Sequence, residues 1–322
     1  MGRFVKIVAA EDGKLNNVMN GRVLVSAMML GLAAASGCAK AKEAPMNEVG
    51  WGAAKAVADT QGTPGQGVTS APLGFDRNDY PGDSTMAALR KQFSFTGYWL
   101  TNPPGESNNS WVGKRATLRD QGWGFLVLAN GKLDAEIVKA QKSGAAPAEL
   151  GKKDAAAAVA AARKEGFPAG TILFLDQEEG GRLLEEQAQY LLAWTEAVAG
   201  SIYKPGVYAS GQPVEDAPGK TITTIEDIRA HIKAGHLHDV AVFDYQDACP
   251  PSPGCTVQTK PLSAAGEPDL TVWQYAQSPR RPEITKSCAQ TYAADGNCYA
   301  TGFPSLFLDM DLATSTDPSH GR

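Results

Sequence analysis

Short apolar runs, separated by helical or polar stretches, recur along the chain from Leu73 onward. Eight of them have the length and composition of buried strands. They lie at residues 73–76, 95–99, 124–129, 171–176, 206–209, 240–245, 270–275 and 305–309. A run that is apolar throughout is typical of a strand buried on both faces, as in a parallel sheet covered by helices.

Amphipathic stretches lie between these runs and predict helices. The candidates are residues 84–93, 111–121, 152–165 and 182–201. In the last of these, Leu184, Leu191 and Trp194 can line one broad apolar side. Repeated strand and helix units with eight strands predict an α/β fold of the TIM type, a (β/α)8 barrel. A doubly wound open sheet is the alternative.

The N-terminal region has the pattern of an export signal. Arg22 precedes an apolar run at residues 23–35, and the run ends at Ala35-Ser36-Gly37-Cys38. This run is too short to span a membrane, and its small residues suit a cleavage site. The pattern resembles bacterial lipoproteins, which implies lipidation of Cys38 and membrane anchoring in the cell envelope.

These patterns divide the chain into four parts. We expect a signal peptide with its lipobox at 1–38, a flexible linker at 39–71, a barrel domain at 72–315 and a tail at 316–322. The linker is assigned on its Ala, Gly, Lys, Glu and Thr content, which lacks a sustained apolar period. The net charge of −5 and the pI near 5.5 argue against a nucleic-acid partner, because there is no basic surplus to neutralise phosphates.

Four cysteines follow Cys38, at Cys249, Cys255, Cys288 and Cys298. In an exported chain an even number of cysteines indicates disulfides. The short intervals favour the pairs Cys249–Cys255 and Cys288–Cys298, while two other pairings remain open. A zinc site is the competing interpretation, but the spacings lack Cys-x-x-Cys and no histidine is close in sequence.

Two carboxylates end the fourth apolar run, at Asp176 and Glu178. Residues two apart on a strand point the same way, and the carboxyl ends of barrel strands are where active sites lie. Paired carboxylates suit acid/base work on a glycosidic bond, because burial and mutual repulsion keep one protonated while the other is charged. The alternative is that these acids stabilise the dipole of a helix beginning near Arg182.

Other predicted strand ends carry further acids and aromatic side chains. The acids are Asp76 at the first strand and Asp309 and Asp311 at the eighth. The candidates for substrate binding are Asp311 and six other residues, which are Trp99, Tyr208, Tyr245, Trp273, Gln274 and Tyr275. Aromatic rings can stack on the C–H faces of sugars, although each ring alone also fits a role in the core.

Five of these segments, in order, resemble a known group of proteins. They are Gly74-Phe-Asp76, Leu175-Asp-Gln-Glu178, Gly206-Val-Tyr-Ala-Ser210, Val272-Trp-Gln-Tyr275 and Leu308-Asp-Met-Asp311. Together they look like the strand motifs of lysozyme-type glycoside hydrolases of family twenty-five. They look closer still to the bacterial glycoside hydrolase-like barrel family of unassigned function.

The resemblance covers residues 73–312 and implies roles for individual residues. It makes Glu178 the proton donor to the leaving sugar oxygen, with Asp176, Asp76 and Asp309 as supporting carboxylates. It implies a glycan partner, such as peptidoglycan, and no cofactor. A non-catalytic glycan-binding or scaffolding protein on the same barrel is the alternative. A metal held by Asp76, Asp176 and Asp309 is a third hypothesis, although we expect no metal.

Overall fold

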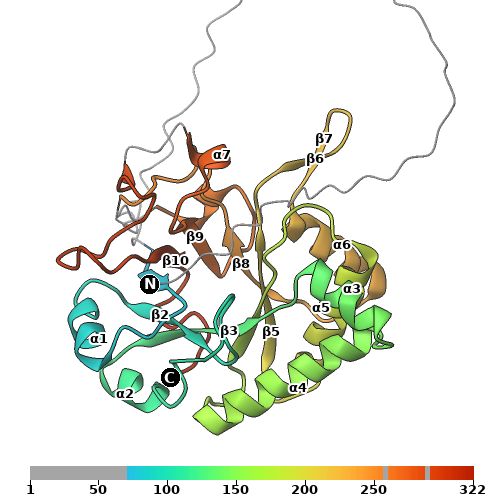
Figure 1. The fold of residues 1–322 in the computed structure, drawn as a ribbon, viewed down its shortest axis with the longest axis horizontal. Coiled ribbons are helices and arrows are strands. Elements are labelled where there is room, and N and C mark those ends of the chain that lie inside the picture. The colour runs from blue at the N-terminus through green and yellow to red at the C-terminus, as the bar shows by residue number, and fades with distance from the viewer. Residues whose placement is uncertain (1–70, 257–259, 287–290) are drawn as a thin grey trace, which may run out of the picture. The chain divides into compact units, whose positions relative to one another are not determined.

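Eight strands close into a barrel, as the apolar runs predict (Figure 1). The computed structural model describes residues 71–256, 260–286 and 291–322. The strands, in their order around the barrel, are β1 (Leu73–Asp76), β10 (Asp309–Ala313), β9 (Val272–Ala276), β8 (Ala241–Tyr245), β5 (Lys204–Ser210), β4 (Ile172–Asp176), β3 (Gly124–Asn130) and β2 (Phe95–Trp99). The predicted TIM-type barrel is therefore confirmed.

One strand differs from the prediction in place and direction. The eighth strand was expected at residues 305–309, but β10 begins at Asp309 and runs antiparallel to both β1 and β9. A parallel strand needs a crossover connection, usually a helix. The described part of the chain between β9 and β10 holds only the four-residue helix α7 (Pro282–Thr285). The reversal brings the start of β10 to the end of the barrel where the parallel strands finish.

Helices connect the parallel strands and cover the barrel. They are α1 (Asp83–Leu89), α2 (Arg115–Asp120), α3 (Asp134–Lys142), α4 (Pro147–Glu165), α5 (Glu185–Ala199) and α6 (Thr224–Gly235), with a 3-10 turn at Leu262–Ala265. The helices predicted at 84–93, 111–121, 152–165 and 182–201 are present with shifted ends. None of the described helices is long and apolar enough to cross a membrane.

Helices α3, α6 and α7 and one hairpin were not predicted. Helix α6 begins with a capping box in which Thr223 accepts from the Glu226 amide and Glu226 accepts from the Thr223 amide. This sequence signal could have located the helix. The hairpin of β6 (Val214–Ala217) and β7 (Lys220–Ile222) leaves the barrel after β5 (Figure 1).

Aromatic side chains fill the barrel below the strand ends. Phe174 meets Phe243 edge to face at 6.1 Å, and Phe243 meets Tyr208 at 4.7 Å. Gly206 makes room for this layer, because a Cβ on it would lie 2.5 Å from the Phe174 ring. The packed layer closes the barrel interior, so chemistry is restricted to the strand ends.

The predicted disulfide pairing is wrong. Cys255 bonds to Cys298, 43 residues away, with a Cα–Cα distance of 5.2 Å. Cys249 is also disulfide-bonded, and Cys288 lies outside the described residues. The short intervals suggested local closure, but the loops after β8 and β9 leave neighbouring strands and pack on each other. The Cys255 amide donates to Thr291 Oγ1 at 2.8 Å in this contact.

The predicted signal peptide, Cys38 and almost all of the predicted linker fall within residues 1–70. These residues lie outside the described part of the chain, so these expectations remain predictions.

Candidate functional site

The end of β4 places two neighbouring acids in different surroundings. Asp176 is the last residue of β4 and is buried, whereas the side chain of Glu178, two residues later, is exposed to solvent. Glu179 is turned toward helix α3. Its carboxylate accepts from the Asp134 amide at 2.7 Å and from Gln187 Nε2 at 2.5 Å. Glu179 therefore caps the beginning of α3, which is not the helix near Arg182 that the sequence analysis considered, and Glu178 is left facing solvent.

The antiparallel strand β10 brings two more acids beside the end of β1. Asp309 pairs with Asp76, and Asp311 pairs with Gly74 on one side and with Gln274 on the other. Asp76 and Asp311 are buried, and Asp309 is half-buried. The Ser278 amide donates to Asp309 Oδ1 at 2.5 Å.

We call Asp76, Asp176, Asp309 and Asp311 the buried acid cluster. Electrostatic coupling links its members to one another and to Glu178. The structure therefore brings together the acids that the sequence analysis placed at one barrel end.

Burial dominates the electrostatics of the buried acid cluster. Desolvation raises the pKa of Asp76 to about 7, although hydrogen bonds from Gln274 and Asp311 pull it down. Desolvation also raises the pKa values of Asp176, Asp309 and Asp311 well above the usual range, and negative charges nearby add to each shift. Like charges at close range cannot all ionise together. The cluster therefore holds protons at neutral pH.

Glu178 combines access to solvent with a raised pKa. Solvent reaches its side chain, yet enough protein surrounds the carboxyl for desolvation to raise its pKa. The positive charge of Arg281 opposes this shift without cancelling it. A carboxyl that is reachable and protonated more readily than usual suits a general acid.

Arg281 was missed by the sequence analysis. It follows β9 in a loop, and its guanidinium lies over the Tyr245 ring, 4.4 Å from the ring centre. Its half-buried side chain also interacts with Asp247, which is buried. Only the adjacent basic pair Arg280-Arg281 marked this segment, and nothing in the pattern linked it to residues on β4 and β8.

Tyr208 and Tyr245 form one wall beside the acids. Their rings stack with centres 4.9 Å apart, and the Tyr245 hydroxyl donates to the Glu178 carbonyl at 3.0 Å. Both rings are almost fully buried. Tyr245 thereby holds the backbone of Glu178, and both rings present little surface to a ligand.

The other aromatic candidates also pack in the interior. Trp273 and Tyr275 are fully buried, on the opposite face of β9 from Gln274. The Trp273 indole donates to the Gln246 carbonyl at 2.9 Å, and the Trp99 indole donates to the Arg77 carbonyl at 3.1 Å. Trp99 is 4% exposed. The structure does not bring these three rings onto an open surface beside Glu178.

Gly97 on β2 leaves the space that Asp76 occupies. A Cβ on Gly97 would lie 2.5 Å from Asp76 Cβ and 3.1 Å from Asp76 Cα. The first distance is shorter than real Cβ contacts allow and the second is tight, so any side chain here would displace Asp76. The glycine is therefore part of how the site is built.

The residues that the structure describes contain no group of three or more His, Cys, Asp or Glu side chains arranged to hold a metal ion. The hypothesis of a metal held by Asp76, Asp176 and Asp309 finds no support in this geometry.

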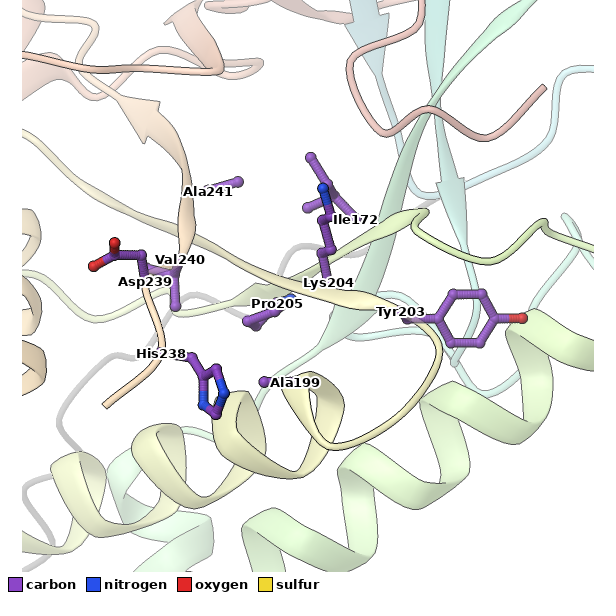
Figure 2. Close-up of a pocket in the computed structure, with 9 residues that line it drawn as sticks. All are labelled: Ile172, Ala199, Tyr203, Lys204, Pro205, His238, Asp239, Val240 and Ala241. Atoms are coloured by element: carbon purple, nitrogen blue, oxygen red, sulfur yellow. The ribbon is translucent and has the colours of Figure 1, made fainter. Parts of the chain in front are cut away.

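A cavity of about 400 Å³ lies at the other end of the barrel (Figure 2). Ile172, Lys204 and Ala241, which begin β4, β5 and β8, contribute to its lining. His238 also lines it and meets Glu196 Oε2 through Nδ1 at 2.9 Å. The packed aromatic layer lies between this cavity and the strand ends, so it is separate from the buried acid cluster.

Comparison with known proteins identifies a related domain. The sequence model of the Rv2525c-like, glycoside hydrolase-like domain matches residues 91–275, more than half of the chain. No curated protein matches the chain.

Three solved structures are similar to this chain at low sequence identity. An uncharacterised protein of B. stearothermophilus is 20% identical, with a TM-score of 0.46 over 75% of this chain and 95% of that one. The catalytic domain of endolysin ply40, from bacteriophage P40 of Listeria monocytogenes, is 14% identical, with a TM-score of 0.44 over 80% and 100%. The Tat-secreted protein Rv2525c of Mycobacterium tuberculosis is 13% identical, with a TM-score of 0.42 over 78% and 98%.

Proposed function

The chain belongs to the Rv2525c-like, glycoside hydrolase-like family, and we propose that it hydrolyses a cell-wall glycan such as peptidoglycan with Glu178 as the general acid. One observation carries the proposal. Glu178 is open to solvent, has a raised pKa and is coupled to the buried acid cluster. Glycoside hydrolysis needs a carboxyl that gives a proton and negative charge near the sugar ring.

The proposed reaction assigns a part to each group. Protonated Glu178 gives its proton to the glycosidic oxygen as the bond from that oxygen to the anomeric carbon breaks. Positive charge then develops on the sugar ring, and the buried acid cluster supplies the opposing negative charge. Water then adds to the anomeric carbon and forms the new reducing end, and the proton that this water loses returns to the Glu178 carboxylate, either directly or through solvent.

Arg281 has a supporting part in this proposal. Its positive charge opposes the rise in the pKa of Glu178 that desolvation causes. The carboxylate left after proton transfer therefore has a cation nearby in a poorly solvated place. Stacking on Tyr245 holds the guanidinium, and Tyr245 also holds the Glu178 backbone. The acid and its counter-charge are therefore fixed by the same ring.

The direct test is release of reducing ends from purified peptidoglycan by the wild-type protein. We expect release that increases with time and with enzyme concentration, and muropeptide analysis should show cleaved glycan strands. Hydrolysis would be contradicted if the protein bound the polymer but released no reducing ends at every pH tested between 4 and 8. It would favour the non-catalytic glycan-binding alternative.

We further propose that the protein is exported and anchored to a membrane by lipid at Cys38. The Cys255–Cys298 disulfide supports export, because such bonds persist in oxidising compartments. Wild-type protein is expected in the membrane fraction and released only by detergent, whereas Cys38→Ser is expected in the soluble exported fraction. Equal detergent dependence of the two proteins would contradict lipidation at Cys38.

A further inference from the structure

A row of hydrogen bonds runs from the loop after β9 to Asp76. Gln277 Nε2 donates to the Tyr208 hydroxyl at 2.7 Å, and that hydroxyl donates to Gln274 Oε1 at 2.8 Å. Gln274 Nε2 then donates to Asp76 Oδ2 at 2.8 Å. Gln274 and Tyr208 are almost fully buried, and Gln277 is half-buried.

Every donor in this row points toward Asp76. The Tyr208 hydroxyl has one proton. Because its oxygen accepts a hydrogen bond from Gln277, the hydroxyl uses that proton to donate a hydrogen bond to the Gln274 carbonyl. The Gln274 carbonyl is thereby occupied, which leaves its NH2 group for Asp76. An oxygen that receives a donor in this way is stabilised in its unprotonated form.

Asp311 lies on β10, between the strands that carry Asp76 and Gln274, and it is fully buried. Neither of its carboxyl oxygens has an ordinary donor, although Asp311 and Asp76 are close enough to hydrogen-bond to each other. Two carboxylates can form such a bond only if one is protonated. Since Gln274 already donates to Asp76, the arrangement in which Asp311 keeps the proton and donates it satisfies both groups.

We propose that Asp76 carries the negative charge of the buried acid cluster, and that Gln274, Tyr208 and Asp311 are positioning residues that hold it in that state. The assignment of this charge to the sugar's transition state rests on the proposed function. The location of the charge does not depend on it. The sequence analysis expected Tyr208 and Gln274 to bind substrate. Under this proposal they act through Asp76 instead.

The surroundings of Asp76 agree with this assignment. The titratable groups that face it are Asp309 and Asp311 on β10, Asp176 and Glu178 at the end of β4, and Tyr208 on β5, with the cation Arg281 beyond Glu178. Of the four cluster acids, Asp76 alone receives a side-chain amide donor. Burial raises its pKa only to about 7, while the other three are held well above their usual range.

Carboxyl-carbon NMR titration tests this proposal without requiring turnover. In the wild type, a buried carboxyl should titrate near pH 7, and its signal should be absent from Asp76→Asn. Gln274→Met removes the donor and should move that titration upward by at least one pH unit. Tyr208→Phe, a milder change that keeps the ring, should move it in the same direction by less.

Asp311 provides the conservative comparison. Asp311→Asn keeps an N–H donor toward Asp76 and should leave the titration within half a pH unit, whereas Asp311→Val should raise it. Gln246→Met is the matched control, because Gln246 is a buried glutamine that donates to the Gly211 carbonyl outside this row. It should leave the Asp76 signal unchanged.

The outcomes separate this inference from the proposed function. The proposal would be overturned if the near-neutral titration disappeared in Asp311→Asn and persisted in Asp76→Asn. It would also be overturned if neither Gln274→Met nor Tyr208→Phe shifted that titration. Where peptidoglycan is hydrolysed, the acidic limb of kcat/KM should move with the NMR titration. If the wild type releases no reducing ends, the proposed function fails while the NMR result still decides where the charge lies.

Discussion

Replacing Glu178 by glutamine is expected to lower the rate of glycan hydrolysis roughly 100- to 10,000-fold, the usual contribution of a general acid. The amide has nearly the same shape, but it cannot give a proton to the glycosidic oxygen. Glycan binding should be retained, because size and hydrogen-bonding capacity are almost unchanged. The measurement is kcat and KM for release of reducing ends, with binding followed separately by sedimentation with the polymer.

Glu179 provides the control for this substitution. It is the next residue along the chain, but its carboxylate is committed to the Asp134 amide and to Gln187. Glu179→Gln should therefore alter stability slightly and keep most of the activity. If Glu178→Gln retained more than a tenth of the wild-type kcat, Glu178 would not be the acid. Equal losses in both variants would point to a general disturbance of the loop.

The second large effect is a fall in stability as pH rises. An unfolded aspartate has a pKa near 3.9, whereas burial raises the pKa of Asp76 in the folded protein to about 7. Between these values the folded state binds more protons than the unfolded state, so the free energy of unfolding decreases with rising pH. For Asp76 alone the decrease is about 4 kcal/mol, complete just above pH 7.

Chemical denaturation at pH 4.5, 6 and 7.5 measures this effect. Asp76→Asn should flatten the curve and be relatively more stable at pH 7.5, because its amide carries no charge to desolvate. Asp120→Asn removes an exposed carboxyl on α2 and is the control, with a curve parallel to that of the wild type. Parallel curves for the wild type and Asp76→Asn would show that burial of Asp76 does not raise its pKa.

The acids of the site could be located from sequence because strand geometry is local. An apolar run that ends at Asp176 places the carboxyl end of a buried strand within a residue or two. The same argument applied to Asp76. Asp309 was expected at the end of a parallel strand. It instead begins the antiparallel strand β10, and this reversal places it at the same end of the barrel.

Partners from different loops could not be located in this way. Arg281 and Glu178 are about a hundred residues apart, and nothing in either segment codes for their approach. The Cys255–Cys298 bond is a similar case, because the choice among cysteines depends on which loops pack together. The aromatic candidates were misplaced for another reason. Both faces of a barrel strand are buried, so the sequence does not show whether a ring points toward the site or packs in the core.

The sequence by itself determined the α/β barrel and the positions of its acids along the chain, because continuous apolar runs and their ends follow from the local periodicity of strands. Only the tertiary structure decided the direction of β10, the disulfide partner of Cys255 and the row of donors that ends on Asp76. These features depend on contacts between segments distant in sequence. Which carboxyl is charged depends on burial and on neighbours that only the closed barrel supplies.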